Sequence, residues 1–290
     1  MRITLPAYPP FSLPMVIRSH GWIQLAPFAG EEPYETFTYL DRLQSGRVVL
    51  LRVEPEGDGV CVTADGDLTE AEQAEVADKV RWMVGLDRDL ALFYAVAQDE
   101  PKLAHVIAQA RGRILRSPTL FEDTVKTILT TNTAWSGTIR MAQALVELYG
   151  EPLPGDDTRR AFPTPERLAE TDVEDLRQTA RLGYRAPYVG ELARRVATGD
   201  LDLEALKTAD LPTPALRQEL LAIKGVGGYA VANLLLLLGR PDFIPIDSYA
   251  FKMVSNEFYG GAPVGPKEVE AAFARWGEWK GMAYWFWDWS

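Results

Sequence analysis

The sequence predicts an α+β protein in which a β-rich front precedes an all-helical remainder. From about residue 10 to 65, short apolar runs alternate or are rich in β-branched residues, which is typical of strands. After residue 86, apolar residues recur every three or four positions, which is typical of helices. We therefore expect a small antiparallel sheet domain at residues 1–85 and a mostly helical body at residues 86–290.

The β-rich part contains three expected strands, at residues 36–40, 47–53 and 59–63. A helix is expected to follow from Thr69, because a threonine can cap the first turn and Glu70 and Glu72 suit its positive end.

The helical part contains twelve segments with helical periodicity, and proline-rich turns at residues 152–155 and 211–214 punctuate them. Residues 230–238 are apolar on every side, which indicates a buried helix. In chain order, the segments are 86–97, 101–111, 119–131, 134–149, 165–170, 172–180, 185–197, 202–207, 213–223, 228–238, 247–258 and 266–275.

The composition is typical of a soluble globular protein, with 47% hydrophobic and 24% charged residues. A single cysteine, Cys61, excludes an internal disulfide and a four-cysteine iron–sulfur cluster. The two histidines lie far apart in the sequence, which argues against a protein-ligated zinc site. The N-terminal residues lack the apolar core of a signal peptide, and the longest purely apolar run, Leu234–Leu238, is too short to span a bilayer. We expect a cytoplasmic protein without membrane association.

The formal net charge of −11 argues against a nucleic-acid partner, because phosphate binding normally requires basic surface. The charges are unevenly distributed. Residues 65–78 contain six acids and no base. Residues 102–126 contain two acids and five bases, namely Lys102, Arg111, Arg113, Arg116 and Lys126. The sequence therefore leaves open a local basic surface opposite an acidic one.

The most informative stretch is Ala222–Ala230, which reads AIKGVGGYA, together with Ile244–Asp247, which reads IPID. Gly225-Val226-Gly227 lies between two apolar helical runs and can form a tight hairpin that leaves backbone amides at the second helix's N-terminus. Such amides, aided by the helix dipole, bind a phosphate without a charged side chain. The Pro-x-Asp loop brings one carboxylate beside them, and this combination suggests chemistry on a nucleic-acid sugar.

These two motifs, in this order and at this spacing, resemble the helix-hairpin-helix Gly/Pro-Asp (HhH-GPD) signature of the DNA glycosylase superfamily. Other segments resemble its 8-oxoguanine and alkylpurine (3-methyladenine) branch, namely residues 11–19, 86–94, 117–133, 182–188 and 276–283. The resemblance implies a TBP-like sheet domain and a body of two helical lobes with the cleft between them. It implies a base-excision-repair enzyme that flips a damaged base out of double-stranded DNA, acts as a monomer and hydrolyses the N-glycosidic bond.

Asp247 is the expected catalytic residue. Cleavage of an N-glycosidic bond builds positive charge on the sugar, and a carboxylate fixed in a water-poor site stabilises that charge and can orient the attacking water. The alternative is that Asp247 only caps the helix that begins at Ser248, since aspartate is a good N-cap residue. The two roles are compatible, because the bond that caps the helix would also hold the catalytic carboxylate in a fixed position.

Tyr229 stands two residues after Gly227, where the resemblance places the lysine of bifunctional, strand-nicking members. A phenol cannot form the imine that this reaction needs, and alkylpurine glycosylases also carry an aromatic residue there. This favours a monofunctional enzyme for alkylated purines, with oxidised purines as the other substrate class. The rivals are a bifunctional lyase that uses another lysine, Lys224 or Lys252, and a DNA-binding or lesion-scanning protein without catalysis.

The resemblance also assigns DNA contacts to the hairpin. The amides of Gly225 and Gly227 would bind a phosphate 3′ of the damaged nucleotide, with Lys224 and Tyr229 beside them. A potassium or sodium ion bridging to this phosphate would be held by the backbone carbonyls of Leu221, Ile223 and Val226. No cofactor is expected to be required.

Asn132 follows Thr130-Thr131 at an expected helix junction. In the 8-oxoguanine branch an asparagine here enters the gap left by the flipped base, so the resemblance implies that Asn132 contacts DNA. A plain loop residue is the alternative. Nearby, Trp135 is expected to be a buried anchor of the core. Its alternative role is to form the apolar part of the wedge that enters the gap left by the flipped base.

Aromatic side chains are expected to line the pocket for the extruded base. Five of the eight tryptophans lie in the last 15 residues, and of these Trp276 or Trp279 is expected to reach the pocket, with Phe273 and Tyr229 as further candidates. A tryptophan-rich end can instead dock on the core. His20 is also a pocket candidate, and it stands where 8-oxoguanine enzymes have a base-reading glycine, which weakens an 8-oxoguanine assignment. A structural histidine is the alternative.

Overall fold

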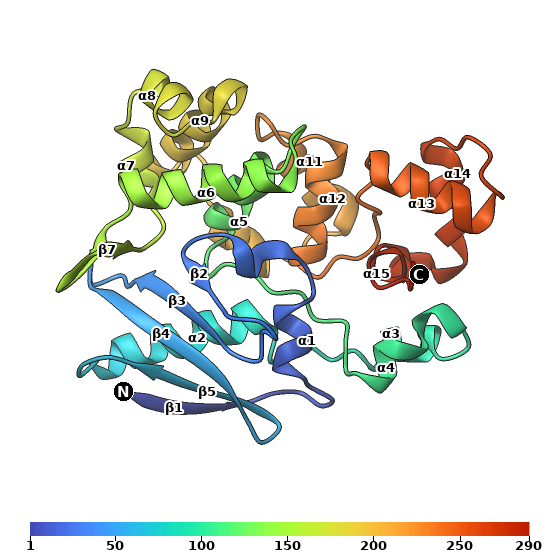
Figure 1. Ribbon diagram of the computed structural model, residues 1–290, viewed down its shortest axis with the longest axis horizontal. Coiled ribbons are helices and arrows are strands. Elements are labelled where there is room, and N and C mark those ends of the chain that lie inside the picture. The colour runs from blue at the N-terminus through green and yellow to red at the C-terminus, as the bar shows by residue number, and fades with distance from the viewer. Residues whose placement is uncertain (290) are drawn as a thin grey trace. The chain divides into compact units, whose positions relative to one another are not determined.

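The computed structural model describes residues 1–289 and comprises two compact units. Unit 1 contains residues 1–88 and 113–208, and unit 2 contains residues 89–112 and the chain from Ala209 onward. Each unit is therefore built from two separate stretches of chain (Figure 1). The domain division expected after residue 85 stays a prediction.

Unit 1 contains a five-stranded antiparallel sheet with the strand order β1-β5-β4-β3-β2. Three strands confirm the expected ones, and the short strands β1 and β2 are additional. The full set is β1 (Arg2–Pro6), β2 (Phe28–Ala29), β3 (Phe37–Arg42), β4 (Val48–Glu56) and β5 (Gly59–Ala64).

The prediction of strands from residue 10 onward is wrong in its first part, because two short helices precede β2. They are α1 (Leu13–Ile17), which has a proline in its first turn, and the 3-10 helix η1 (Gly21–Gln24). Helices of one turn are too short to display a helical period, so the apolar residues there resemble a strand.

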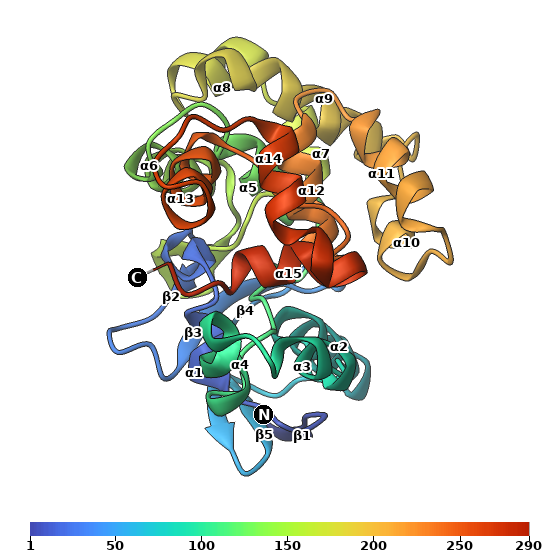
Figure 2. The same ribbon diagram turned by 90° about the vertical axis from the view of Figure 1, so that its right-hand side faces the viewer.

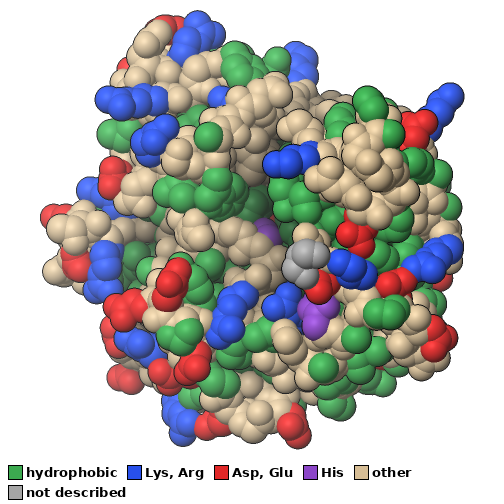
Figure 3. All heavy atoms as spheres, turned by 45° about the vertical axis from the view of Figure 1, so that its right-hand side comes forward, with side chains coloured by type: hydrophobic (Ala, Val, Ile, Leu, Met, Phe, Trp, Pro, Cys, Tyr) green, Lys and Arg blue, Asp and Glu red, His purple; other side chains and the backbone are tan. Residues whose placement is uncertain are grey.

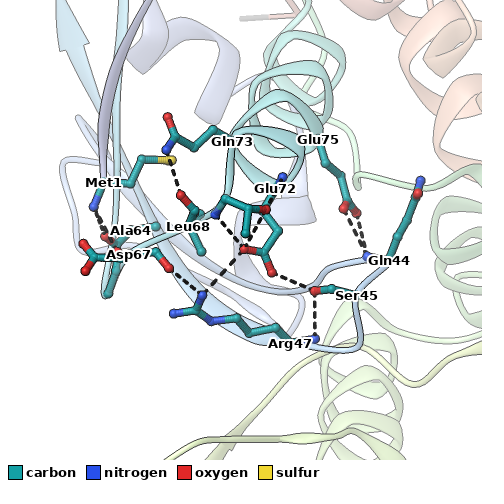
Figure 4. Close-up of polar contacts among 12 residues, drawn as sticks. Met1, Gln44, Ser45, Arg47, Ala64, Asp67, Leu68, Glu72, Gln73 and Glu75 are labelled. Atoms are coloured by element: carbon teal, nitrogen blue, oxygen red, sulfur yellow. Dashed lines mark hydrogen bonds and ion pairs between the residues drawn. The ribbon is translucent and has the colours of Figure 1, made fainter.

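The helix α2 (Glu70–Val84) confirms the cap expected at Thr69, since Thr69 Oγ1 accepts a hydrogen bond from the Glu72 amide and Glu72 accepts one from the Thr69 amide. Figure 4 shows that Glu72 also accepts a hydrogen bond from Ser45 and that Glu75 accepts one from the Gln44 amide. The bond from the Thr69 amide is the largest of several causes that hold the pKa of Glu72 below its ordinary value. Part of the acidic run is therefore used to join α2 to the β3–β4 turn.

The remaining elements of unit 1 are mostly helical. A two-stranded hairpin interrupts them at residues 152–160, where only a turn was expected. Helices α6, α9 and α10 pack against α5, which is buried along its whole length. The elements are α5 (Leu120–Leu129), α6 (Trp135–Tyr149), β6 (Pro152–Leu153), β7 (Asp156–Arg160), α7 (Pro165–Ala169), α8 (Val173–Gln178), η3 (Gly183–Arg185), α9 (Ala186–Ala197) and α10 (Leu203–Thr208).

Unit 2 is helical, and its core includes the apolar helix α12 (Gly228–Leu237), as expected. Figure 2 shows α15 beside α12 and α14, and these helices pack together. The helices of the two units together confirm all twelve expected helical segments. Most of the observed helix ends lie within a few residues of the expected ones. The others are α3 (Ala91–Ala97), η2 (Pro101–Leu103), α4 (Ala104–Ala108), α11 (Thr213–Leu221), α13 (Ser248–Phe258), α14 (Pro266–Phe273), η4 (Ala274–Trp279) and α15 (Lys280–Trp285).

Candidate active site

The expected hairpin joins α11 to α12 in unit 2. Two short-range bonds close its turn: the Ile223 amide donates to the Leu220 carbonyl at 3.2 Å, and the Val226 amide donates to the Ile223 carbonyl at 3.0 Å. Gly225 has a φ of +89°, in the left-handed region that glycine enters without steric strain. The GVG sequence therefore makes the tight turn that its residues predicted.

The N-terminal end of α12 is open. Among residues 1–289, the amides of Gly225 and Gly227 have no hydrogen-bond partner. A Cβ added at Gly227 or Gly228 would meet open space, and no acidic side chain lies in the first turn of α12. Donor amides at the positive end of a ten-residue helix are able to bind a phosphate, and phosphate binding by this hairpin stays a prediction.

Asp247 is the N-cap of α13, and its Oδ1 accepts a hydrogen bond from the Ala250 amide at 2.8 Å. The capping role is therefore real. Within residues 1–289, the second carboxylate oxygen, Oδ2, accepts no hydrogen bond. The cap fixes the half-buried carboxylate at a rigid helix end and leaves Oδ2 able to interact with a ligand.

The buried phenol of Tyr284, on α15, relates Asp247 to the hairpin. Burial raises the pKa of Tyr284 well above its ordinary value, and the nearby charge of Asp247 raises it further, as do Tyr229 and Tyr249. Unit 2 therefore brings Asp247 and Tyr229 to the same buried phenol, although 18 residues separate them in sequence. Sequence reasoning missed Tyr284 and Tyr249. Tyr249 could have been found from its position two residues after Asp247, whereas no local signal singles out Tyr284.

Most of the tryptophan-rich C-terminal segment docks on the core of unit 2. Phe273 is fully buried, and its ring centroid lies 5.4 Å from that of Trp276 and 5.3 Å from that of Trp287. Trp276 is only 5% exposed, whereas Trp279 is half-buried against Phe93. Phe273 presents no surface to a ligand in this arrangement, and a pocket role for Trp276, Trp279 or Tyr229 stays a prediction.

Asn132 belongs to unit 1 and follows α5 at a helix junction, as expected. Its φ of +47° lies in the left-handed region, which asparagine tolerates better than most residues. Its Nδ2 donates to the Tyr184 hydroxyl at 3.3 Å, and the guanidinium of Arg185 donates to the carbonyl of Thr131. The loop is thus tied to η3 and exposes Asn132, whose contact with DNA stays a prediction.

Two other predicted residues of unit 1 occupy structural positions. Trp135 begins α6 and is 37% exposed, with its Nε1 donating to Gln24 Oε1 at 2.7 Å, so the expectation of a core anchor is wrong. His20 Nε2 donates to the Leu115 carbonyl at 2.6 Å. Desolvation lowers the pKa of His20 to about 4, with a smaller contribution from the charge of Lys126, so the imidazole is neutral at pH 7. These contacts favour the structural alternative for His20.

The local basic surface that the sequence left open at residues 102–126 is not formed, because three of its five bases are buried: Arg113, Arg116 and Lys126. Arg113 donates to four backbone carbonyls, and Lys126 pairs with Glu122. On the face that Figure 3 shows, Lys and Arg side chains are interspersed with Asp and Glu. Hydrogen bonds inside unit 1 account for the burial of Arg113 and Lys126, and the guanidinium of Arg116 lies over the Trp82 ring, 4.3 Å from its centroid.

The hairpin has oxygen donors of the kind that a monovalent cation prefers. The carbonyl of Ile223 receives the Val226 amide and keeps a second lone pair, and the carbonyls of Leu221 and Val226 flank it in sequence. Among residues 1–289, no group of three or more His, Cys, Asp or Glu side chains could hold a metal ion. Among the helices of residues 1–289, none combines the length and the hydropathy that a membrane span requires.

Comparison with known proteins places these features in a family. The model of the HhH-GPD superfamily of base excision DNA repair proteins matches residues 125–278, which is more than half of the chain and includes both the hairpin and Asp247.

Two curated relatives are similar over most of their length. The DNA-3-methyladenine glycosylase of Bacillus subtilis is 26% identical over 223 residues, which cover 73% of this chain and 71% of the relative. The probable N-glycosylase/DNA lyase of Methanothermobacter thermautotrophicus is 25% identical over 232 residues, which cover 72% of each chain.

The fold is also that of a solved glycosylase. The 3-methyladenine DNA glycosylase from Archaeoglobus fulgidus superposes with a TM-score of 0.75 at 20% identity, covering 99% of this chain and 97% of the other. The fold, the paired hairpin and Pro-x-Asp motifs and the family match agree, and the chain belongs to the HhH-GPD superfamily of base excision DNA repair proteins as a DNA glycosylase.

Proposed function

We propose that this glycosylase is monofunctional and releases alkylated purines from double-stranded DNA, with Asp247 as its catalytic residue and water as the nucleophile. The observation that carries this proposal is the geometry of Asp247, whose Oδ1 accepts from the Ala250 amide at the rigid start of α13 while its Oδ2 accepts no hydrogen bond within residues 1–289. Tyr229 occupies the position at which a lyase needs an amine. The names of the Bacillus subtilis and Archaeoglobus fulgidus proteins support the substrate class.

In this mechanism the open N-terminus of α12 binds a DNA phosphate through the amides of Gly225 and Gly227. Asp247, fixed by its bond to the Ala250 amide, uses its remaining oxygen to stabilise the positive charge that develops on the sugar. An alkylated purine is electron-poor, so the aromatic face of Tyr229 suits the extruded base. Asn132 contacts the DNA from unit 1.

We also propose that the protein works as a cytoplasmic monomer without a required cofactor. The hairpin carbonyls of Leu221, Ile223 and Val226 would hold a potassium or sodium ion, whose positive charge would strengthen phosphate binding at the hairpin. The oxygen-only donor set supports this choice, because hard cations prefer carbonyl oxygens.

The proposal is tested by Asp247→Asn, which keeps an N-cap side chain and removes its charge. We expect single-turnover release of a defined alkylated purine from a duplex to fall by at least about a thousandfold, with duplex binding within a few-fold of wild type. Asp172→Asn is the matched control, because Asp172 also caps a helix, accepting from the Glu174 amide, but lies in unit 1. If Asp247→Asn retained most of the activity, Asp247 would not be the catalytic residue, and its role would be only that of a helix cap.

The bifunctional alternative is favoured by the names of two relatives, the probable N-glycosylase/DNA lyase of Methanothermobacter thermautotrophicus and the N-glycosylase/DNA lyase of Saccharomyces cerevisiae. We expect borohydride to trap no covalent protein–DNA adduct on any lesion that the enzyme excises, because Tyr229 cannot form an imine. An adduct that disappears in Lys224→Arg or Lys252→Arg would identify the lysine used and overturn the monofunctional assignment.

A further inference from the structure

Unit 1 contains a cavity of about 350 Å³ that none of the proposed catalytic residues lines. Its walls come from β3, α2, the start of α5, the segment before α7 and the segment between α9 and α10. The volume lies in the range of small-molecule sites. Much of the lining is apolar and includes Leu40, Phe121, Phe162, Val196, Leu201 and Leu203.

The two basic side chains of the cavity are already paired with acidic partners. Lys79 donates to both oxygens of Asp41 and to the carbonyl of Arg42, and it pairs with Glu75 at 2.8 Å. Arg42 pairs with Glu151. An ammonium group has three donors and no acceptor. An anionic ligand at Lys79 would therefore have to displace one of its existing partners.

The acidic side chains, in contrast, keep acceptor capacity. Asp41 is 4% exposed, and within residues 1–289 it accepts hydrogen bonds only from Lys79, although a carboxylate has about four lone-pair sites. Burial raises the pKa of Asp41 to about 6, so the carboxylate is charged at pH 7.5 and gains from a second cation. Four acids line the cavity against two bases: Asp41, Glu122, Asp202 and Glu204 against Arg42 and Lys79. Acids still outnumber bases when their ion-pair partners are included, which are Lys126, Lys207, Glu75 and Glu151. The local charge therefore favours a cation.

Two phenylalanines supply flat walls in the same cavity. The rings of Phe121 and Phe162 meet edge to face, with their centroids 6.5 Å apart. Aromatic faces attract a cation and pack against a flat apolar body. We propose that this cavity is a second ligand site, which binds a small organic cation consisting of a protonated primary amine on a flat apolar body, with the ammonium beside Asp41 and the body against Phe121 and Phe162.

The test uses the full chain at pH 7.5 with three probes of matched shape: 2-phenylethylamine, 2-phenylethanol and 3-phenylpropionate. Ligand-observed NMR and calorimetry measure binding without reference to glycosylase activity, so the result is independent of the proposed function. We expect the amine to bind saturably with a Kd of about 1 mM, which is reasonable for so small a ligand. The alcohol should bind at least about tenfold more weakly, and the propionate should not bind measurably.

Two variants locate the bound amine. Asp41→Asn should weaken amine binding about tenfold, because it removes the charge that faces the ammonium. Leu201→Trp, on a half-buried position of the lining, should abolish binding by filling the cavity, whereas Leu148→Trp is a control on an exposed position of α6 outside it. If Asp41→Asn fails to fold, as judged by circular dichroism, the probe series and Leu201→Trp decide the question. Absence of amine binding, equal binding of the three probes or unchanged binding in Leu201→Trp would each overturn the proposal.

Discussion

The helices α5 and α12 are both ten residues long and both buried, but they differ in what they bury. The side chains of α12 are apolar except for Tyr229 and Asn233. All ten residues of α5 are buried, and these include Glu122, Asp123 and Lys126. Apolar sequence therefore predicts burial, but charged sequence does not predict exposure.

The two helices also satisfy their polar groups in different ways. In α12, Asn233 Nδ2 donates to the Tyr229 carbonyl one turn earlier, so the helix supplies its own partner. In α5, Lys126 Nζ lies 2.6 Å from Glu122 Oε1, and the Tyr39 hydroxyl of β3 donates to Glu122 Oε2 at 2.5 Å. A buried charge is tolerated only when it is paired and hydrogen-bonded. The charged positions of α5 thus depend on the sheet, whereas α12 depends on apolar packing.

The sharpest way to break this comparison is to remove one charge of the buried pair. Lys126→Met leaves Glu122 buried without its cation, so we expect the free energy of unfolding to fall by about 3–5 kcal/mol in urea titrations. The double variant Glu122→Gln/Lys126→Met should recover at least about 2 kcal/mol of that loss, because no charge then stays buried and unpaired. A double variant as unstable as the sum of its single changes would show that the pair is not coupled.

The corresponding change in α12 should have a slightly smaller effect. Leu235 is fully buried, and Leu235→Ala should lower the free energy of unfolding by about 3 kcal/mol through lost apolar contact and the cavity that remains. In Lys126→Met, a second substitution at Glu122 can restore part of the lost stability. Leu235 has no single partner of this kind, so no second substitution is expected to restore the stability lost in Leu235→Ala. Urea titration measures the effect, and a loss below about 1 kcal/mol would mean that the neighbouring residues collapse into the cavity.

The smallest effect expected is a dependence of the free energy of unfolding on pH. It arises from a buried acid in α5, and the apolar side chains of α12 cannot produce it. Burial raises the pKa of Asp123 to about 6, although hydrogen bonds from Trp22 and the Ser117 amide oppose the shift. Since the folded-state pKa lies above the ordinary value, the native state binds the proton more tightly than the unfolded state. The contribution of Asp123 to stability is therefore largest below pH 4 and falls as the pH rises to about 6.

Asp123→Asn removes this titration and keeps an oxygen for Trp22 and Ser117. Relative to wild type, the variant should gain about 2 kcal/mol of stability between pH 4 and pH 7. Urea titrations of both proteins at several pH values measure the difference. A difference that stays constant across this range would contradict the raised pKa.

The features that the sequence predicted correctly are local ones. Helical periodicity located the helices, the Thr69 cap began α2, and the glycines of 225–227 predicted a tight turn. Asp247 was identified as an N-cap, because its motif lies directly before α13. Local rules suffice here, since caps, turns and periods depend on neighbouring residues.

Only the tertiary structure decided which charged and aromatic residues are internal. Glu122 and Asp123 are buried because Tyr39 and Trp22, 83 and 101 residues away in sequence, supply their hydrogen bonds. Arg113 is internal because four carbonyls converge on it, and Phe273, rather than Trp279, occupies the aromatic core. Tyr284 was recognised only after folding placed it near Asp247. The physical reason is that desolvating a polar group is tolerable only where partners compensate it, and those partners are brought together by the fold.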